Sequence, residues 1–254
     1  AELFGEFGIE VGSHVCSIGD VEAPPPQALP DDLNRTADAS PVRTLSEKAG
    51  VRMMEAIDQA KEEGDTLGGI FEVVVRGLPA GLGSYVSYDT KLDGRLAGAI
   101  MSIQAIKGVE IGVGFEGARR PGSEVHDPIT TDESAPRAGG IGRSSNRAGG
   151  LEGGITTGEL LVVRAAMKPI STLRKRLPSV DMRDGSAKDA AVERSDVCAV
   201  PAAAVVGEAM VALVLADAFL DGCKSMTVGA VILGLAGYQY RRIVSSGRTA
   251  DRTQ

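Results

Sequence analysis

The chain of 254 residues has few aromatic residues, histidines and cysteines. Aromatic residues make up 4% of it, and Trp is absent. Its two histidines are too few for a multi-histidine site, so no metal site is predicted. Cys16, Cys198 and Cys223 form no CxxC pair, which disfavours a zinc ribbon or a disulfide scaffold and suits a reducing cytoplasm.

An excess of positive charge is also lacking. The sequence has 27 Lys and Arg against 34 Asp and Glu, a net charge of −7. This balance argues against nucleic acid or anionic lipid as the main partner, and a bound anion would need a local basic cluster. With 43% hydrophobic and 24% charged residues, we expect a globular protein of one large or two small domains.

No secretory signal is expected, because no basic region precedes an apolar core at the start of the sequence. Two apolar stretches further along the chain need comparison with a membrane span. Residues 199–220 include Pro201, Glu208 and Asp217, and residues 226–237 fall short of the roughly 20 residues that a span requires. A buried or amphipathic helix is the better interpretation of both stretches. No membrane partner is therefore predicted.

Hydrophobic periodicity predicts alternating strands and helices. Strands are expected over residues 9–18, 69–76, 107–113 and 160–167, and helices over 46–64, 92–105 and 199–220. The first helix would bury Val51, Met54, Ile57 and Ala60, and the last would line one face with Val205, Ala209, Ala212 and Ala216. The helices are too few for a doubly wound sheet, so antiparallel strands with packed helices are favoured.

A literal GxGxxG is formed by Gly112, Gly114 and Gly117. A dinucleotide-binding site needs a helix directly after the strand, and Pro121 and Gly122 disfavour one here. We therefore interpret the motif as a strand end followed by a turn. An oxidoreductase using NAD or NADP is kept as an alternative.

Two segments could bind an anion. Successive glycines in residues 137–154, with Arg143 and Arg147, would let backbone N–H groups converge on an anion or a flat ring, although a solvated loop is the simpler interpretation. The following segment places Lys168, Ser171 and Thr172 around a stiff proline, which suits a phosphate or cofactor cradle.

Charged and histidine residues elsewhere leave alternatives open. Arg194 and Asp196 precede the last helix and could be an ion pair, a helix cap, or an acid tuned by a fixed cation. His14 lies within a predicted strand, where a satisfied core or edge histidine is expected. His126 has no nucleophile motif nearby, so neither histidine supports a catalytic triad.

Five long segments of the sequence are informative when taken together: KLDGRLAGAIMSIQAIKGVEIGVGF, GSEVHDPI, RSSNRAGGLEGGITTGE, RAAMKPISTLRK and ERSDVCAVPAAAVVGEAMVALVLADA. In this order, they resemble the chorismate synthase family over residues 1–218. The resemblance implies an α/β (α+β) sandwich of antiparallel sheets enclosing helices. It also implies one domain over residues 1–254 that lacks its N-terminal third, with an atypical tail at residues 221–254.

The same resemblance implies an activity. The family eliminates phosphate from 5-enolpyruvylshikimate 3-phosphate to give chorismate, using reduced FMN, as a cytoplasmic homotetramer. Catalytic roles would fall to Arg194 and Asp196, the latter near flavin N5, while Asn146 and Ala148 would line the same pocket. The implied FMN contacts are Gln104, Ala105, Gly153, Lys168, Pro169, Ile170, Ser171, Thr172 and Arg194.

The resemblance also has gaps. The family's GESHG-type motif, the arginines that grip the substrate phosphate and the Ser-Ala-Arg motif are missing from this sequence, and His14 does not match the catalytic histidine. We therefore expect little turnover from this chain alone. A catalytically incomplete fragment, or a flavin-binding assembly module, is the alternative function.

Overall fold

The computed structural model describes residues 2–131 and 140–225, and the chain divides into two compact units, residues 1–214 and 215–254. The second apolar stretch at 226–237 and most of the predicted tail lie outside the described residues.

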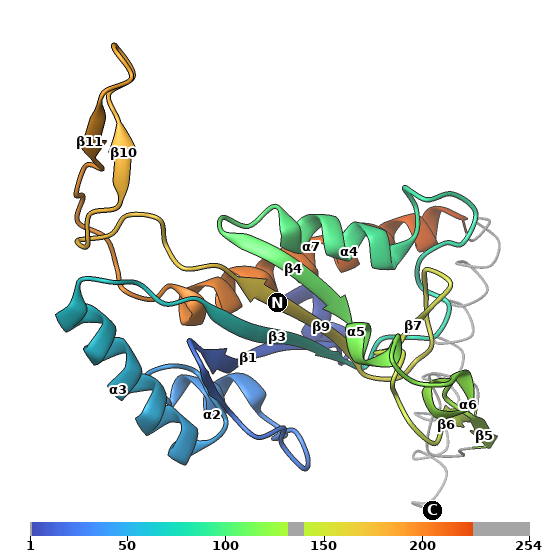
Figure 1. Ribbon diagram of the computed structural model, residues 1–254. Coiled ribbons are helices and arrows are strands. Elements are labelled where there is room, and N and C mark those ends of the chain that lie inside the picture. Colours follow the sequence, from blue (N-terminus) through green and yellow to red (C-terminus); the bar gives the residue numbers. More distant parts are fainter. Residues whose placement is uncertain (1, 132–139, 226–254) are drawn as a thin grey trace, which may run out of the picture. The chain divides into compact units, whose positions relative to one another are not determined.

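A five-stranded antiparallel sheet forms the centre of the first unit (Figure 1). Its order is β2-β1-β3-β9-β4, and every neighbouring pair is antiparallel. The expected class, helices packed with antiparallel strands, is confirmed. The strands are β1 (Glu10–Ile18), β2 (Val21–Glu22), β3 (Gly69–Arg76), β4 (Ile106–Ile111) and β9 (Leu161–Met167).

Helix α3 (Glu47–Glu63) begins and ends as the sequence predicts. The Ser46 hydroxyl accepts a hydrogen bond from Ala49 N at 3.3 Å, and Gly64 closes the helix at φ 72°. The predicted buried face is wrong except at Ala60. Ala49, Gly50 and Met53 are buried instead, because tertiary packing decides between adjacent apolar stripes; Val51 and Met54 are exposed.

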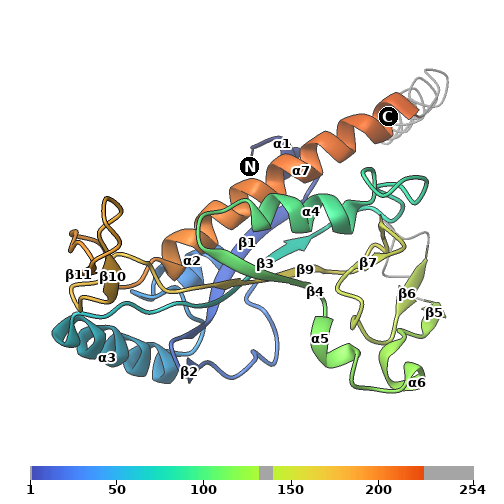
Figure 2. The same ribbon diagram turned by 45° about the horizontal axis from the view of Figure 1, so that its top comes forward.

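The remaining helices of the sheet layer are α1 (Glu2–Glu6), α2 (Leu33–Asp38), α4 (Leu92–Met101) and α7 (Val200–Ser225). In Figure 2, α4 and the first half of α7 lie over one face of the sheet, and α3 lies on the other side. Helix α4 ends four residues before the predicted position, because the chain must turn there into β4.

Helix α7 packs on β3 through small residues. A Cβ added at Gly207 would lie 2.8 Å from the Phe71 ring and 3.0 Å from a Val73 methyl, so glycine permits a close approach. The predicted apolar face is wrong, since Val205 is exposed. The buried positions are Val200, Ala203, Ala204, Gly207 and Val211.

Residues Val200–Asp221 form the one helix in the described ranges that is long and apolar enough to cross a membrane, and a third of it is buried. Its Glu208 carboxylate accepts hydrogen bonds from Ser13 Oγ at 2.5 Å, Arg43 at 3.0 Å and Asn34 Nδ2 at 3.1 Å. A charged side chain tied into the protein in this way favours the predicted core helix over a span.

Short elements lie between β4 and β9 in the chain. These are α5 (Gly114–Gly117), α6 (Gly122–Val125), and the ribbons β5 (Ile129–Thr131) with β6 (Ile141–Arg143) and β7 (Leu151–Glu152) with β8 (Ile155–Thr156). A third ribbon, β10 (Pro178–Val180) with β11 (Ala187–Asp189), follows the predicted loop after β9.

Candidate cofactor site and its surroundings

Three of the predicted site segments touch one another. Lys168 N donates a hydrogen bond to Ala105 O at 2.9 Å, and Ser195 Oγ donates to Thr172 O at 2.7 Å. Segments centred on residues 105, 170 and 195 are therefore contiguous, although up to 90 residues separate them in the chain.

Sheet pairing explains this contact. Ile106 lies opposite Met167 in the β4–β9 ladder, so the residues just outside the ladder, Ala105 and Lys168, also meet. Ala105 has φ 66°, a left-handed conformation that costs a residue with a Cβ on the order of 1 kcal/mol. This turn leaves the side chain of Gln104 exposed beside residues 168–172, which we call the lysine loop.

The strand-like segment before β3 holds the other two segments. Thr66 Oγ1 donates to Ile170 O at 2.6 Å, and Leu67 N donates to Val197 O at 2.8 Å. The two acceptors, Ile170 and Val197, belong to the segments around residues 170 and 195. These bonds therefore limit how far the two segments can move apart.

The charged groups of these segments are exposed and uncompensated. Lys168 Nζ donates to Pro169 O at 3.2 Å, and within residues 2–131 and 140–225 no carboxylate lies at ion-pair distance from Lys168 or Arg194. The ion pair between Arg194 and Asp196 is therefore not formed, and Asp196 does not cap α7, which begins at Val200.

Asp127 organises the glycine-rich loop, a role that the sequence analysis missed. Its carboxylate accepts hydrogen bonds from Ser145 Oγ at 2.5 Å and from the backbone N–H groups of Arg147 and Ala148 at 2.8 Å. Burial alone would raise the pKa of Asp127, but these three bonds outweigh it and hold the pKa below its usual 3.8. The available signal was an aspartate directly before a proline.

The same loop is fastened to β9 by Asn146. Its Nδ2 donates to Leu160 O at 2.7 Å, and its Oδ1 accepts from Gly150 N at 2.8 Å. The amide of Asn146 is thus used inside the loop. Gly153 lies in the exposed turn between β7 and β8 at φ 61°, where an added Cβ would meet nothing within 4 Å.

The structure does not bring this loop to the lysine loop. Gly154 O accepts from Leu92 N at the start of α4, whereas Ala105 follows the end of that ten-residue helix, about 15 Å further along. Asn146 is bonded to Leu160, the residue before β9, whereas Lys168 directly follows the other end of this strand. The FMN contact assigned to Gly153, and the place of Asn146 and Ala148 in the same pocket, remain predictions.

The GxGxxG motif is a strand end with a turn, as interpreted. Helix α5 has four residues, and Phe115 N donates to Glu110 Oε1 at 3.0 Å, so a carboxylate sits where a pyrophosphate would bind. Gly112 serves close packing: an added Cβ would lie 2.2 Å from Arg147 O. The geometry gives no support to a nicotinamide dinucleotide site here.

Three hollows lie away from the contiguous segments. One of about 780 Å³ is lined by residues including Phe4, Asp32, Arg76 and Glu208. One of about 290 Å³ includes Arg143 and Glu152. The third, of about 220 Å³, lies over β1, β3 and β9 and includes His14, Cys16, Glu72 and Arg164.

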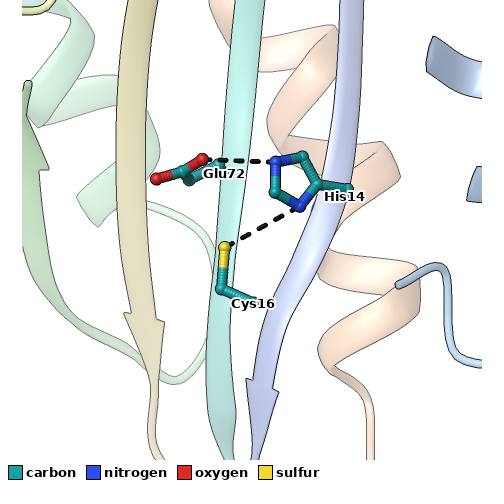
Figure 3. Close-up of side chains that lie close together, drawn as sticks. All are labelled: His14, Cys16 and Glu72. Atoms are coloured by element: carbon teal, nitrogen blue, oxygen red, sulfur yellow. Dashed lines mark hydrogen bonds and ion pairs between the residues drawn. The ribbon is translucent and has the colours of Figure 1, made fainter. Parts of the chain in front are cut away.

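A row of polar side chains crosses four strands beneath this third hollow. The ladders pair His14 with Glu72, Glu72 with Arg164 and Arg164 with Glu110. His14 Nε2 lies 3.2 Å from Glu72 Oε2 (Figure 3), and Arg164 Nε donates to Glu72 Oε1 at 2.9 Å. His14 is only 3% exposed, which confirms its expected place in the core, but its Nε2 has no partner in hydrogen-bond geometry among the described residues, so the expectation that it is satisfied is not met.

Electrostatics keeps Glu72 charged and Cys16 neutral. Burial disfavours the carboxylate, but His14 and Arg164 outweigh it and lower the pKa of Glu72. Burial first, and then the Glu72 carboxylate, raise the pKa of the Cys16 thiol to about 12. Without another cation, Cys16 is protonated at neutral pH and is a poor nucleophile.

Comparison with known proteins identifies the family. The chorismate synthase family profile matches residues 1–220, and the chain belongs to that family. Chorismate synthase 1 of Bacillus cereus (strain ZK / E33L) is 55% identical over 221 residues, which are 87% of this chain and 56% of that protein. Chorismate synthase of Geobacter sulfurreducens is 53% identical over 239 residues, 93% and 61% of the two chains.

A solved structure agrees with this assignment. It is titled "Crystal Structure of Chorismate Synthase", has a TM-score of 0.70 and 44% sequence identity, and is matched over 87% of this chain and 60% of its own. The suspected family and the fold class are thereby confirmed. The chain spans little more than half the length of the relatives that it matches.

Proposed function

We propose that the protein to which this chain belongs eliminates phosphate from 5-enolpyruvylshikimate 3-phosphate to give chorismate, with reduced FMN as cofactor. Family membership supports the reaction class. The observation that carries the cofactor assignment is the contact between the segments at 105, 168–172 and 195, made through Lys168 N and Ser195 Oγ.

The donor groups of these segments suit an FMN phosphate. Lys168 and Arg194 are exposed cations without a carboxylate partner in the described part of the chain, and Ser171 and Thr172 add hydroxyl donors. In a chain of net charge −7, such a spot is where an anion would be attracted.

Each residue then has a defined task. Lys168 and Arg194 would neutralise the phosphate, and Pro169 would reduce the entropy lost when the loop is ordered. Gln104 would offer its amide to the polar edge of the ring system. Asp196 would hold or move a proton at flavin N5. Bound reduced FMN would supply electron density to the carbon centre from which phosphate departs.

We also propose, from the family resemblance, that the protein is a cytoplasmic homotetramer. The free thiols of Cys16 and Cys198 are consistent with a reducing compartment. A flavin-binding module without turnover is the alternative function. It is distinguished by activity rather than by cofactor binding.

Titration of the chain with reduced FMN under anaerobic conditions tests the cofactor assignment. Arg194→Ala should raise the FMN dissociation constant at least tenfold, because it removes one of two cations. Arg176→Ala is the matched control, since Arg176 is an equally exposed arginine outside the contiguous segments. Equal affinities of the two variants would refute the assignment.

Phosphate release from 5-enolpyruvylshikimate 3-phosphate tests the reaction itself. Because little turnover is expected from this chain alone, the assay uses the whole protein to which the chain belongs, and a whole protein that binds reduced FMN but releases no phosphate supports the module. Release of phosphate with formation of chorismate, lost in Asp196→Ala, supports the lyase.

A further inference from the structure

Three side chains of different metal-ligating types lie close together on one face of the sheet. His14 and Cys16 lie two residues apart on β1, and Glu72 lies opposite His14 on β3. One donor atom from each of them lies within 4.8 Å of the others. Figure 3 shows one imidazole nitrogen facing the carboxylate and the other facing the thiol, with Cys16 Sγ 3.9 Å from His14 Nδ1.

Strand alternation places His14 and Cys16 on the same face of β1, because they lie two residues apart. The pairing with β3 skips a residue between Val15 and Ser17, so Cys16 is the extra, unpaired residue of a bulge. Bulges redirect side chains and are typical of functional positions in sheets. Cys16 lies close to His14 and Glu72 in Figure 3, at a position that no residue of β3 pairs with.

His14 itself is incompletely satisfied. Its side chain is 4% exposed, and Nε2 has the Glu72 oxygen at 3.2 Å but no partner in hydrogen-bond geometry among the described residues. A buried nitrogen without such a bond carries an energetic penalty that a ligand would remove. The hollow of about 220 Å³ above the cluster provides room for that ligand.

From this geometry we propose that His14, Cys16 and Glu72 bind a zinc ion. Imidazole nitrogen, thiolate sulfur and carboxylate oxygen are the three donors that Zn²⁺ prefers, and a three-residue set leaves its fourth position for water or an anion. The proposal is independent of the flavin-dependent reaction.

Binding requires a small contraction of the cluster. Zn–N and Zn–S bonds of about 2.0 and 2.3 Å at tetrahedral angles place donor atoms about 3.5 Å apart. One zinc ion binds only one nitrogen of a ring, and the proposal assigns Nε2, which faces Glu72; the Cys16 sulfur, which faces Nδ1, must therefore swing toward Nε2. On binding, the sulfur forms a bond to zinc and its proton passes to solvent.

Arg164 would support the site from outside. It binds Glu72 Oε1, while Oε2 is the oxygen that faces His14. One carboxylate oxygen can therefore bind the ion while the other stays hydrogen-bonded, as is common for ligating carboxylates. Glu110, paired with Arg164 at 3.4 Å, offsets the positive charge of the guanidinium.

Titration of the full chain with Co²⁺ and then Zn²⁺ tests the proposal. One equivalent of Co²⁺ should produce a thiolate-to-cobalt charge-transfer band that Zn²⁺ abolishes by displacement. Cys16→Ser should lose the band and bind Zn²⁺ at least tenfold more weakly. The double variant Cys198→Ser/Cys223→Ser, in which Cys16 is the sole cysteine, should retain both.

Thermal unfolding supplies a second readout. Zn²⁺ should raise the Tm of the unaltered chain and of the double variant, with an increase that grows as the logarithm of its concentration above the dissociation constant, but it should not raise that of Cys16→Ser or Glu72→Gln. The proposal is overturned if the unaltered chain binds no stoichiometric Zn²⁺, or if the cobalt band persists without Cys16.

Discussion

The polar row on the sheet and the exposed loops at its end differ in how their charges are compensated. On the sheet, Glu72 faces both His14 and Arg164, and Arg164 faces Glu110 as well. In the loops, Lys168 and Arg194 have no carboxylate partner in the ranges that the structure covers. Compensated charges stabilise the folded chain, whereas uncompensated charges are available to a ligand.

This difference predicts that stability depends on the sheet and cofactor affinity on the loops. The largest loss of stability should come from Phe71→Ala, because Phe71 is fully buried beneath α7. We expect the free energy of unfolding to fall by about 3–5 kcal/mol. Urea denaturation measures it, with Phe115→Ala, which is 71% exposed, as the near-neutral control.

A smaller loss is expected when the polar row is broken. Glu72→Gln removes a charged partner from Arg164 and His14, and should lower the free energy of unfolding by about 1.5–3 kcal/mol. The control Glu116→Gln removes only exposed ion pairs and should change little. Equal losses in the two variants would show that the row is no more important than a surface pair.

The glycine-rich loop should make stability depend on acid. The folded-state pKa of Asp127 is lowered, so its contribution is complete above its unfolded pKa of about 3.9 and is lost as pH falls through the lower folded value. The stability difference between the unaltered chain and Asp127→Asn should therefore shrink from pH 6 to pH 3. A difference that stays constant would exclude this role for the carboxylate.

The smallest change in stability should accompany a large change in binding. Lys168→Ala should alter the free energy of unfolding by less than about 0.5 kcal/mol, because its side chain is exposed. It should nevertheless weaken reduced FMN binding about tenfold. Lys107→Ala serves as control, because Lys107 is another exposed lysine and lies in the neighbouring strand β4. If Lys168→Ala lowered the free energy of unfolding and left the FMN affinity unchanged, the prediction that the loops determine affinity and the sheet determines stability would be contradicted.

Local patterns predicted much of the fold. Alternation located β1 and β3, and a serine and a glycine located both ends of α3, because caps and strand faces depend on neighbouring residues. The buried faces of α3 and α7 were predicted wrongly. Both helices have more apolar positions than one face needs, and packing partners far along the chain select among them.

The candidate site divides in the same way. Long motifs around Gln104, Lys168 and Arg194 indicated the family and its cofactor segments. Nothing in those motifs indicated that Asp127 holds the glycine-rich loop, or that Gly153 lies at the opposite end of α4 from Ala105. Such relations depend on strand register and helix length, which single segments do not encode.

By itself, the amino-acid sequence determined the family, the antiparallel class and the ends of several elements, since these follow from motifs and local backbone preferences. Only the tertiary structure decided that His14, Cys16 and Glu72 meet, that Arg164 is compensated while Lys168 is not, and which helix faces are buried. The physical reason is that cross-strand register and side-chain packing join residues more than fifty positions apart.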